Sequence, residues 1–218
     1  MGSLQDIENS TKQYIVGADE VGYGCLAGPL VIVAVRAPKD WNLEGLGDSK
    51  KLSEKRRDAM TVKLKELIEK GDITWHLAIR SNVEIDKVGV ANALKSCYVE
   101  CFQKLYQPDS LIVTDGILKF DGWDVDSFDK MNLIKADAQV PTVMAASILA
   151  KTHRDALMKS LHTSYPIYDW YSNVGYGSPT HLKAIAEYGP SLVHRFSYAP
   201  MRNMTNPTIV KPLGESND

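Results

Sequence analysis

The chain has 218 residues, a formal net charge of −2 from 25 basic and 27 acidic side chains, and a hydrophobic content of 44%. These values are those of an ordinary globular protein that is long enough to bury a substantial core. They count against a protein that coats nucleic acid through bulk positive charge, although acidic metal ligands lower the net charge of an enzyme while basic patches persist.

The cysteines and the lengths of the apolar runs indicate the cellular compartment of the protein. Cys25, Cys97 and Cys101 are odd in number and form no CxxC pair. Cys97 and Cys101 are four residues apart in a helical pattern, which favours buried thiols on one helix face. No apolar run approaches the roughly 20 residues of a membrane helix, and the N-terminus has no signal-peptide pattern. We therefore expect a cytoplasmic protein in a reducing compartment, without membrane association.

The first predicted strand ends in two adjacent carboxylates. The apolar residues 14–18 are too few for an ordinary helix and are β-branched at their centre, which is typical of a buried strand. Asp19 and Glu20 follow, and adjacent strand residues point to opposite faces. Both carboxylates can reach one ion only if the backbone leaves strand geometry there, a turn that the glycine-rich segment 22–28 permits. The pair indicates either a solvated turn or a site for a divalent cation beside a phosphate.

The next elements alternate between strand and helix. A second apolar run, 30–35, predicts another buried strand. Ser53 is a suitable N-cap for a helix that continues to about Lys70 and ends at Gly71. The alternation of apolar and polar residues over 73–79 predicts a half-buried strand.

Helical spacing returns in the middle of the chain. It extends from about Asn82 to just before Pro108, with an interruption at Gly89. Two further buried strands are predicted over 110–116 and 132–137, and each ends at or beside an aspartate.

The last third of the chain is mainly helical. Pro141 opens a long helix to about residue 162, a loop rich in aromatic residues and glycine covers 165–178, and a short helix follows near 180–188. The interleaved pattern favours an α/β architecture with a central sheet, flanking helices and a C-terminal helical extension from about residue 160. We expect one catalytic domain over residues 1–202 and a mobile tail over 203–218.

Carboxylates at the ends of three predicted strands suggest a metal site. They are Asp19 with Glu20, Asp115 and Asp137. If these strand ends are neighbours, four anionic side chains converge and repel one another unless cations neutralise them. Hard oxygen ligands favour Mg²⁺ or Mn²⁺ over zinc. A single aspartate after a strand is commonly a turn former, but three in one chain favour a metal site.

Six segments of the chain resemble, in order, the motifs of the type 2 ribonuclease H family, most closely bacterial ribonuclease HII. The matching segments are Asp-Glu-Val-Gly-Tyr-Gly-Cys-Leu-Ala-Gly-Pro-Leu at 19–30, then 47–53, 114–116, 135–138 with 145–155, 175–181 and 194–198. Together they cover nearly the whole chain, from about Tyr14 to Arg202. We expect no extra N-terminal module of the kind that ribonuclease HIII has, which favours the HII branch.

The resemblance implies a ribonuclease H-like fold, with a central mixed β-sheet flanked by helices. It also implies an endonuclease that cuts the RNA strand of RNA/DNA hybrids and cuts at ribonucleotides embedded in duplex DNA. The expected reaction is hydrolysis with two divalent cations, Mg²⁺ or Mn²⁺, which leaves 5′-phosphate and 3′-hydroxyl ends. The family's catalytic and metal-binding carboxylates carry over to Asp19, Glu20, Asp115 and Asp137.

The resemblance also places substrate-binding residues. The glycine-loop backbone that recognises the ribose 2′-OH carries over to Gly22, Tyr23 and Gly24, and the tyrosine packed against the sugar carries over to Tyr176. Two positions depart from the family pattern. Tyr23 replaces the usual arginine, which removes a side-chain contact to phosphate but keeps the backbone donors. Ala136 replaces a frequent glycine, which is tolerated if its φ is negative.

Basic residues give further candidates for substrate binding. Residues 50–57 hold the densest basic cluster, which is either a solvated helix face or a phosphate-binding surface. We include Lys50, Lys51 and Lys151 among the candidate substrate-binding residues. Asp155 either orients a nearby metal ligand or forms an ion pair with a neighbouring basic side chain.

His194 and Arg195 have two open roles, since they could contact phosphate or cap a sheet edge. Two other functions remain compatible with the sequence. One is a catalytically silent nucleic-acid-binding module, against which the four carboxylates count because without ions they only destabilise. The other is a metal-dependent DNA nuclease on the same fold. We expect a monomer that binds RNA/DNA hybrids and ribonucleotide-containing DNA duplexes.

Overall fold

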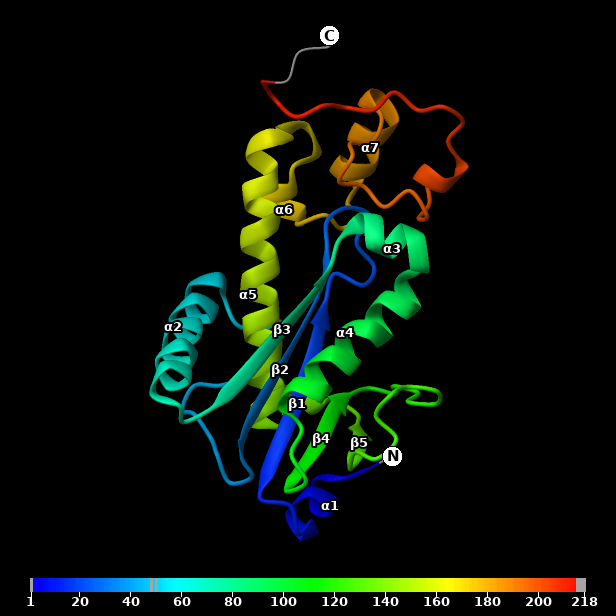
Figure 1. Ribbon diagram of the computed structural model, residues 1–218. Coiled ribbons are helices and arrows are strands. Elements are labelled where there is room, and N and C mark those ends of the chain that lie inside the picture. Colours follow the sequence, from blue (N-terminus) through cyan, green and yellow to red (C-terminus); the bar gives the residue numbers. More distant parts are fainter. Residues whose placement is uncertain (1, 48, 50, 215–218) are drawn as a thin grey trace. The chain divides into compact units, whose positions relative to one another are not determined.

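The computed structural model describes residues 2–47, 49 and 51–214 (Figure 1). The chain divides into two units, each with a hydrophobic core of its own. Unit 1 comprises Met1–Val21, Val31–Ala78 and Lys95–Thr152. Unit 2 comprises Gly22–Leu30, Ile79–Leu94 and His153–Asp218.

A five-stranded mixed sheet, in the order β3-β2-β1-β4-β5, forms the centre of unit 1. The strands are β1 (Tyr14–Val21), β2 (Leu30–Pro38), β3 (Thr74–Arg80), β4 (Ser110–Asp115) and β5 (Lys130–Leu133). β1 is antiparallel to β2 and parallel to β4, and β4 is parallel to β5. The mixed sheet confirms the predicted fold class.

The strand predicted over 132–137 is wrong in its extent. β5 ends at Leu133, and Asp137 lies instead in a 3₁₀ helix, η1 (Ala136–Ala138). Lys135 has a left-handed φ of 60°, which breaks the extended conformation before Asp137 is reached. The positive φ therefore falls on Lys135 and not on Ala136, so the alanine is compatible with its position.

Helices cover both faces of the sheet in unit 1. α2 (Glu54–Lys70) begins at its N-cap Ser53, whose side chain accepts from the Arg56 N–H, and ends at Gly71 with a φ of 79°, as predicted. α2 and the first half of α5 (Pro141–Ser164) pack against the β2 face that carries Val31, Val33 and Val35.

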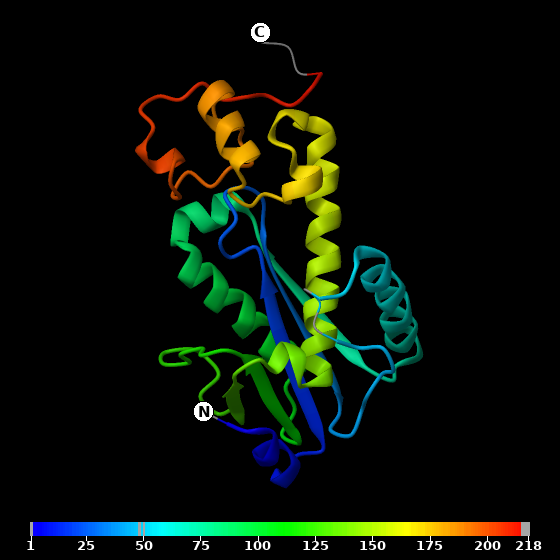
Figure 2. The same cartoon turned by 180° about the vertical axis from the view of Figure 1, so that it is seen from behind.

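The opposite face of the sheet carries Ile32, whose carbonyl oxygen lies 3.9 Å from Cys101 Sγ in α4 (Val90–Leu105). α4 accordingly lies in front of the strands in Figure 1, whereas α5 lies in front of them in Figure 2.

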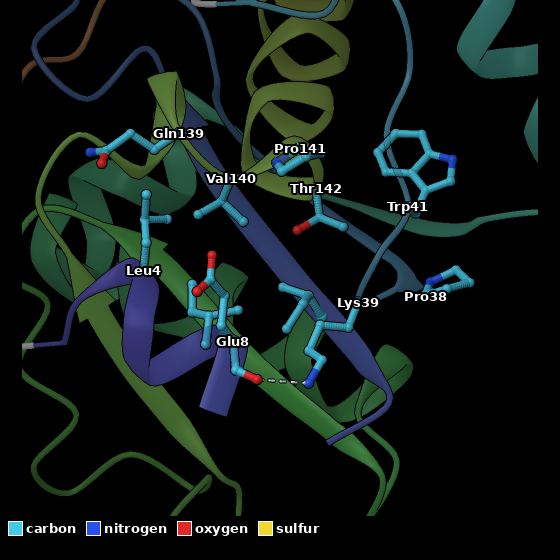
Figure 3. A pocket seen from close by; sticks show the side chains of 11 residues that line it. Leu4, Glu8, Pro38, Lys39, Trp41, Gln139, Val140, Pro141 and Thr142 are labelled. Carbon is cyan, nitrogen blue, oxygen red and sulfur yellow. Dashed lines mark hydrogen bonds between the residues drawn. The ribbon is translucent and has the colours of Figure 1, made fainter. Parts of the chain in front are cut away.

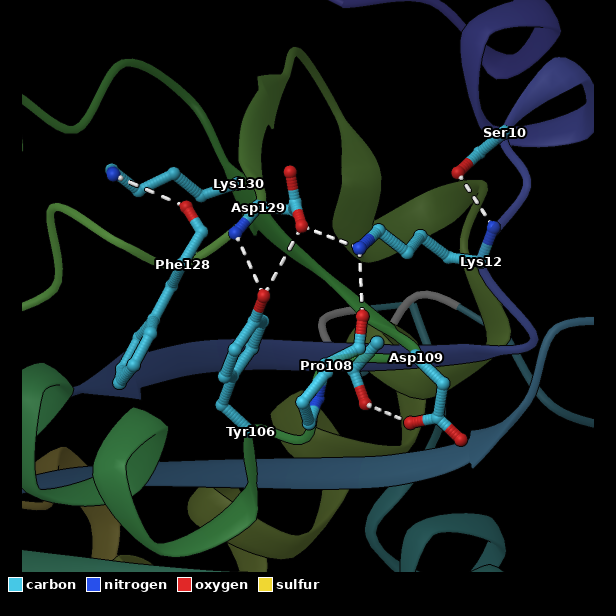
Figure 4. Close-up of polar contacts among 9 residues, drawn as sticks. Ser10, Lys12, Tyr106, Pro108, Asp109, Phe128, Asp129 and Lys130 are labelled. Atoms are coloured by element: carbon cyan, nitrogen blue, oxygen red, sulfur yellow. Dashed lines mark hydrogen bonds and ion pairs between the residues drawn. The ribbon is translucent and has the colours of Figure 1, made fainter.

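A polar cluster joins three distant segments at the edge of unit 1 (Figure 4). Lys12 Nζ donates to the Pro108 carbonyl at 2.7 Å and pairs with Asp129 Oδ2 at 2.5 Å. The Tyr106 hydroxyl donates to the same carboxylate at 3.1 Å, and its ring stacks on Phe128 with centroids 4.2 Å apart. These contacts tie the segment after α1 (Leu4–Asn9) to the end of α4 and to the chain before β5.

Unit 2 is mostly helical. Its remaining elements are α3 (Asn82–Val88), η2 (Pro166–Tyr168), α6 (Trp170–Asn173), α7 (Pro179–Tyr188) and η3 (Met201–Asn203). The break between α3 and α4 at Gly89 is the predicted one, with a φ of 80°. Tyr168 and Trp170 are buried at the centre and stack with ring centroids 5.0 Å apart.

The C-terminal tail makes backbone contacts within unit 2. The Val210 N–H donates to the Pro190 carbonyl at 2.9 Å, and the Leu213 N–H donates to the Ser164 carbonyl at 2.9 Å. Mobility of the tail stays a prediction. Within the described residues, every helix falls short of the length or the apolarity needed to cross a membrane.

Candidate active site

Asp19 and Asp115 occupy equivalent positions on neighbouring parallel strands. The register pairs Gly17 with Val113 and Ala18 with Thr114, and the two aspartates directly follow these pairs. Both are half-buried. Because side chains two residues apart share a face, Asp19 lies on the same face as Gly17, against which the start of α5 packs, and Asp115 on the same face as Val113. The two carboxylates therefore belong to the α5 face of the sheet.

Asp137 is linked to this face through its neighbour. The Ala136 N–H donates to Asp115 Oδ1 at 2.8 Å, which holds η1 against the end of β4. The Asp137 side chain is largely buried. β1, β4 and η1, the segments that carry the four predicted carboxylates, therefore meet at one end of the sheet.

Glu20 lies on the other face. It pairs with Ile32, whereas Asp19 pairs with Val33, and β1 keeps strand geometry through Val21. The turn that would direct both side chains of the doublet toward one ion is thus absent from β1. The convergence of all four carboxylates on one ion stays a prediction.

Tyr98 of α4 is the partner of Glu20. Its hydroxyl donates a hydrogen bond to Glu20 Oε2. Burial, followed by the negative charges of Glu20 and Asp19, raises the pKa of Tyr98 well above its ordinary value, so the phenol stays protonated and donates. Sequence reasoning missed this residue, since a tyrosine between two helical cysteines indicates only a core position.

The donor set suits a hard divalent cation, because all four side chains supply carboxylate oxygens. In the part of the chain that the structure describes, no group of three or more histidine, cysteine, aspartate or glutamate side chains is already arranged to hold a metal. The chemistry of these side chains thus fits Mg²⁺ or Mn²⁺, and their assembly around an ion stays a prediction.

The glycine loop 22–28 in unit 2 presents backbone donors. Gly22 and Gly28 have φ values of 91° and 80°, as expected for a chain that turns sharply. Tyr23 and Gly24 are exposed, and among the described residues their N–H groups have no hydrogen-bond partner. Two donors suitable for a sugar hydroxyl or a phosphate oxygen are therefore available here.

Two buried arginines hold the carbonyl groups of this loop. Arg154 donates to the carbonyls of Ala27 at 3.0 Å and Pro29 at 2.9 Å. Arg195 donates to the carbonyls of Tyr23 at 2.9 Å and Gly28 at 3.0 Å, while burial lowers its pKa.

Both guanidinium groups are fully buried, and within the described residues neither has a carboxylate partner and Arg195 Nη2 has no hydrogen-bond partner. Carbonyl oxygens of the loop thus take the place of carboxylates as acceptors for two buried guanidinium groups. Of the two roles left open for Arg195, direct phosphate contact is wrong because the side chain is inside the unit.

Tyr176 is 42% exposed, and burial of its remaining surface raises the pKa of its hydroxyl. Its backbone is fixed on both sides: the N–H donates to the Asn173 carbonyl at 2.9 Å, and the carbonyl accepts from His181 Nδ1 at 2.8 Å. His194 is fully buried and bonds to His181, so its ring cannot contact phosphate at the surface either. Tyr176 is an exposed aromatic side chain on a turn whose backbone is hydrogen-bonded on both sides.

The basic candidates are only partly described. Lys50 lies outside the described residues, Lys51 is exposed before α2, and Lys151 is half-buried on α5. Arg57 Nη1 donates to the Leu52 carbonyl at 2.7 Å, which gives this member of the cluster a local structural role. Phosphate contact by these residues stays a prediction.

Comparisons with known proteins identify the class. The ribonuclease H2 of Pyrococcus horikoshii OT3 superposes with a TM-score of 0.71 at 23% identity, covering 87% of this chain and 96% of that one. The fold is therefore ribonuclease H-like.

Sequence relatives are more specific. The chain is 38% identical over 205 residues to the ribonuclease HII of Oceanobacillus iheyensis, which covers 91% of this chain and 73% of the relative. It is 40% identical over 185 residues to the ribonuclease HII of Bacteroides thetaiotaomicron, and this match covers 84% of this chain and 88% of the relative. The profile of the Ribonuclease HII family matches residues 16–201. The chain belongs to the ribonuclease HII family and is a ribonuclease H endonuclease.

Proposed function

We propose that this enzyme hydrolyses the RNA strand of RNA/DNA hybrids and cuts at ribonucleotides embedded in duplex DNA. The observation that carries the proposal is the adjacency of Asp19 and Asp115 in the strand register, with η1 bonded to Asp115 beside Asp137. Clustered carboxylates at a sheet end suit metal-assisted phosphodiester hydrolysis.

Asp19, Asp115, Asp137 and Glu20 would hold two Mg²⁺ or Mn²⁺ ions. When bound, these ions supply an activated water and stabilise charge on the leaving 3′-oxygen, with 5′-phosphate and 3′-hydroxyl products. The chain itself positions these side chains: the Ala136 N–H orients Asp115, and the Tyr98 hydroxyl holds Glu20, which would have to leave this hydrogen bond in order to bind an ion.

Discrimination between RNA and DNA requires a group that senses the 2′-OH. The N–H groups of Tyr23 and Gly24 are exposed donors, and the exposed ring of Tyr176 offers a surface for the sugar. Because Arg154 and Arg195 orient the loop carbonyls inward and contribute positive charge, the outer side of the loop favours an anionic backbone. The buried arginines thereby supply part of the positive charge that is lost because Tyr23 stands where the family usually has an arginine.

The test is a cleavage assay on a DNA duplex with one ribonucleotide, on an RNA/DNA hybrid and on an all-DNA duplex, each with and without Mg²⁺ or Mn²⁺. We expect metal-dependent cutting of the first two substrates only, and its loss in Asp115→Asn with the fold retained. Cutting of the all-DNA duplex would favour a DNA nuclease, and binding without cutting would favour a silent module. Turnover above a few per cent in Asp115→Asn would contradict the carboxylate assignment.

A further inference from the structure

The segment 22–25 of the glycine loop forms a β-turn in unit 2. The Cys25 N–H donates to the Gly22 carbonyl at 3.4 Å, so Tyr23 and Gly24 are the two central residues of the turn. Neither central residue has a positive φ, which excludes a type II turn, whose second central residue has a φ of about +80°. The turn therefore differs from the type II form that a glycine at this position permits.

The central peptide of the turn, between Tyr23 and Gly24, has its carbonyl directed into unit 2. This carbonyl accepts from Arg195 Nη1 at 2.9 Å and from the Tyr198 hydroxyl at 2.7 Å. Because a trans peptide is planar, its C=O and its N–H point in opposite directions. The Arg195 side chain is fully buried, so the Gly24 N–H is directed away from the interior and toward solvent.

The direction of this peptide is not fixed by the local sequence. Types I and II differ by a rotation of the central peptide, and a glycine at the second central position accepts both sets of angles. The rotation would replace the carbonyl by an N–H in front of the Arg195 guanidinium and the Tyr198 hydroxyl, which would lose their acceptor. These two donors therefore favour the state in which the Gly24 N–H points outward.

Tyr198 is itself held in place on several sides. Arg195 Nη1 donates to its hydroxyl at 3.2 Å, and the guanidinium carbon lies 5.2 Å from the centroid of its ring. Asp86 of α3 accepts from the backbone N–H groups of Phe196 at 2.7 Å and Ser197 at 2.9 Å, which fixes the chain just before Tyr198. Burial raises the pKa of Tyr198, so its hydroxyl keeps the proton that it donates to the loop.

The outward N–H of Gly24 differs from the ammonium group at the cavity of unit 1. That cavity, of about 230 Å³, lies between α1, the end of β2 and the start of α5 (Figure 3). Lys39 Nζ at its wall donates to the carbonyls of Glu8 at 3.2 Å and Ser10 at 2.8 Å. This ammonium group already serves the fold, whereas the Gly24 N–H is open to a ligand.

We propose that Tyr198 is a positioning residue for ribonucleotide recognition: together with Arg195 it holds the Tyr23–Gly24 peptide so that the Gly24 N–H faces the 2′-OH of the substrate. This inference rests on the proposed function. The effect belongs to the hydroxyl of Tyr198 and not to its ring, because the hydroxyl is the group that bonds the loop carbonyl. Tyr198→Phe therefore removes the positioning contact and keeps the ring beside Arg195.

The test uses two duplexes of identical sequence, one with a single ribonucleotide and one all-DNA, and the full chain. Fluorescence anisotropy without divalent cations gives both dissociation constants while nothing is cut, and the preference for the ribonucleotide duplex isolates the 2′-OH. In Tyr198→Phe we expect this preference to fall about fivefold, the order of one hydrogen bond, with all-DNA affinity unchanged. With Mg²⁺, KM for the ribonucleotide duplex should rise by a similar factor while kcat stays within about twofold.

Tyr188→Phe is the matched control, because it makes the same chemical change at a tyrosine of α7 that is 49% exposed. It should leave the preference and KM unchanged, and a fall equal to that of Tyr198→Phe would overturn the assignment. A loss of folded protein weakens both duplexes equally, so the preference separates positioning from stability.

An unchanged preference in Tyr198→Phe, or equal weakening of both duplexes, would overturn the positioning role and leave the proposed function standing. A parent protein that binds both duplexes equally would also overturn this role. Cleavage of the same two duplexes with Mg²⁺ decides the proposed function independently.

Discussion

The Nε2 atoms of His181 and His194 lie 3.0 Å apart in the core of unit 2, and their partners fix the tautomer of each ring. His181 Nδ1 lies 2.8 Å from the Tyr176 carbonyl and must donate to it, so its Nε2 accepts. His194 Nδ1 accepts from the Ser191 N–H at 2.9 Å, so its Nε2 carries the proton. Both imidazoles are therefore neutral, and together they anchor the backbone of Tyr176.

This arrangement predicts a loss of stability in acid. Burial lowers the pKa of His194 from 6.5 to about 3 and lowers that of His181. Between these values the unfolded chain binds more protons than the folded one, so stability is complete above the unfolded pKa and falls as the pH decreases toward the folded pKa. His194 alone contributes a slope of about 1.4 kcal/mol per pH unit in this window.

Urea unfolding from about pH 7 to about pH 4 measures this slope. Carboxylates also titrate in this range, so the same series is measured on His194→Gln, which lacks the titrating ring. We expect a weaker pH dependence in the variant. Identical slopes for the two proteins would mean that the histidine pair does not control acid stability.

The contact between Tyr98 and Glu20 predicts a divalent-cation-dependent effect of Tyr98→Phe. Loss of a buried hydroxyl that donates to a carboxylate should reduce the metal-free unfolding free energy by about 1–2 kcal/mol. With saturating Mg²⁺ the loss should shrink, because Glu20 then turns to the ions. Tyr106→Phe is the matched control, since its hydroxyl serves the exposed Asp129, and its effect should be small and independent of Mg²⁺. A Tyr98→Phe loss that Mg²⁺ leaves unchanged would contradict a switch of Glu20.

The two buried arginines predict that Arg195→Lys is not a conservative change. Lysine keeps the charge but cannot bond the Tyr23 and Gly28 carbonyls with one planar fork. We expect a loss of about 2–4 kcal/mol in stability and, at a temperature where the variant is folded, a raised KM with a smaller change in kcat. Arg202→Lys, at an exposed position, is the control. An unchanged KM in folded Arg195→Lys would show that this arginine stabilises the fold and does not contribute to substrate binding.

The sequence predicted the elements well where local signals were strong. Ser53 and Gly71 set the bounds of α2, and Gly89 separates α3 from α4. The sequence-based prediction failed where the structure depends on contacts between residues that are distant in the sequence. The apolar run before Asp137 does not show that Lys135 takes a left-handed conformation, and nothing local shows that Tyr98 reaches Glu20 across 78 positions of the chain. The side chains of His194 and Arg195 belong to the interior because their partners are distant carbonyls and rings.

The two glycines that flank Tyr23 separate a structural role from a binding role. A Cβ on Gly22, where φ is 91°, would lie 2.2 Å from Arg154 Nε and 2.8 Å from the Pro29 carbonyl oxygen. A Cβ on Gly24 would meet no atom of the described residues within 4 Å, and this residue has no positive φ. Gly22→Ala should therefore destabilise the protein, whereas Gly24→Ala should leave its melting temperature unchanged.

If the Gly24 backbone approaches the ribose as proposed, the added methyl group of Gly24→Ala stands between loop and substrate. We expect cleavage of the single-ribonucleotide duplex to fall by about tenfold or more in this variant, mainly through KM. Gly47→Ala is the control, because a Cβ there also meets no atom of the described residues within 4 Å and Gly47 lies outside the loop 22–28. Full activity of Gly24→Ala would show that the substrate does not pack against this part of the backbone, and recognition of the 2′-OH would then have to come from another group.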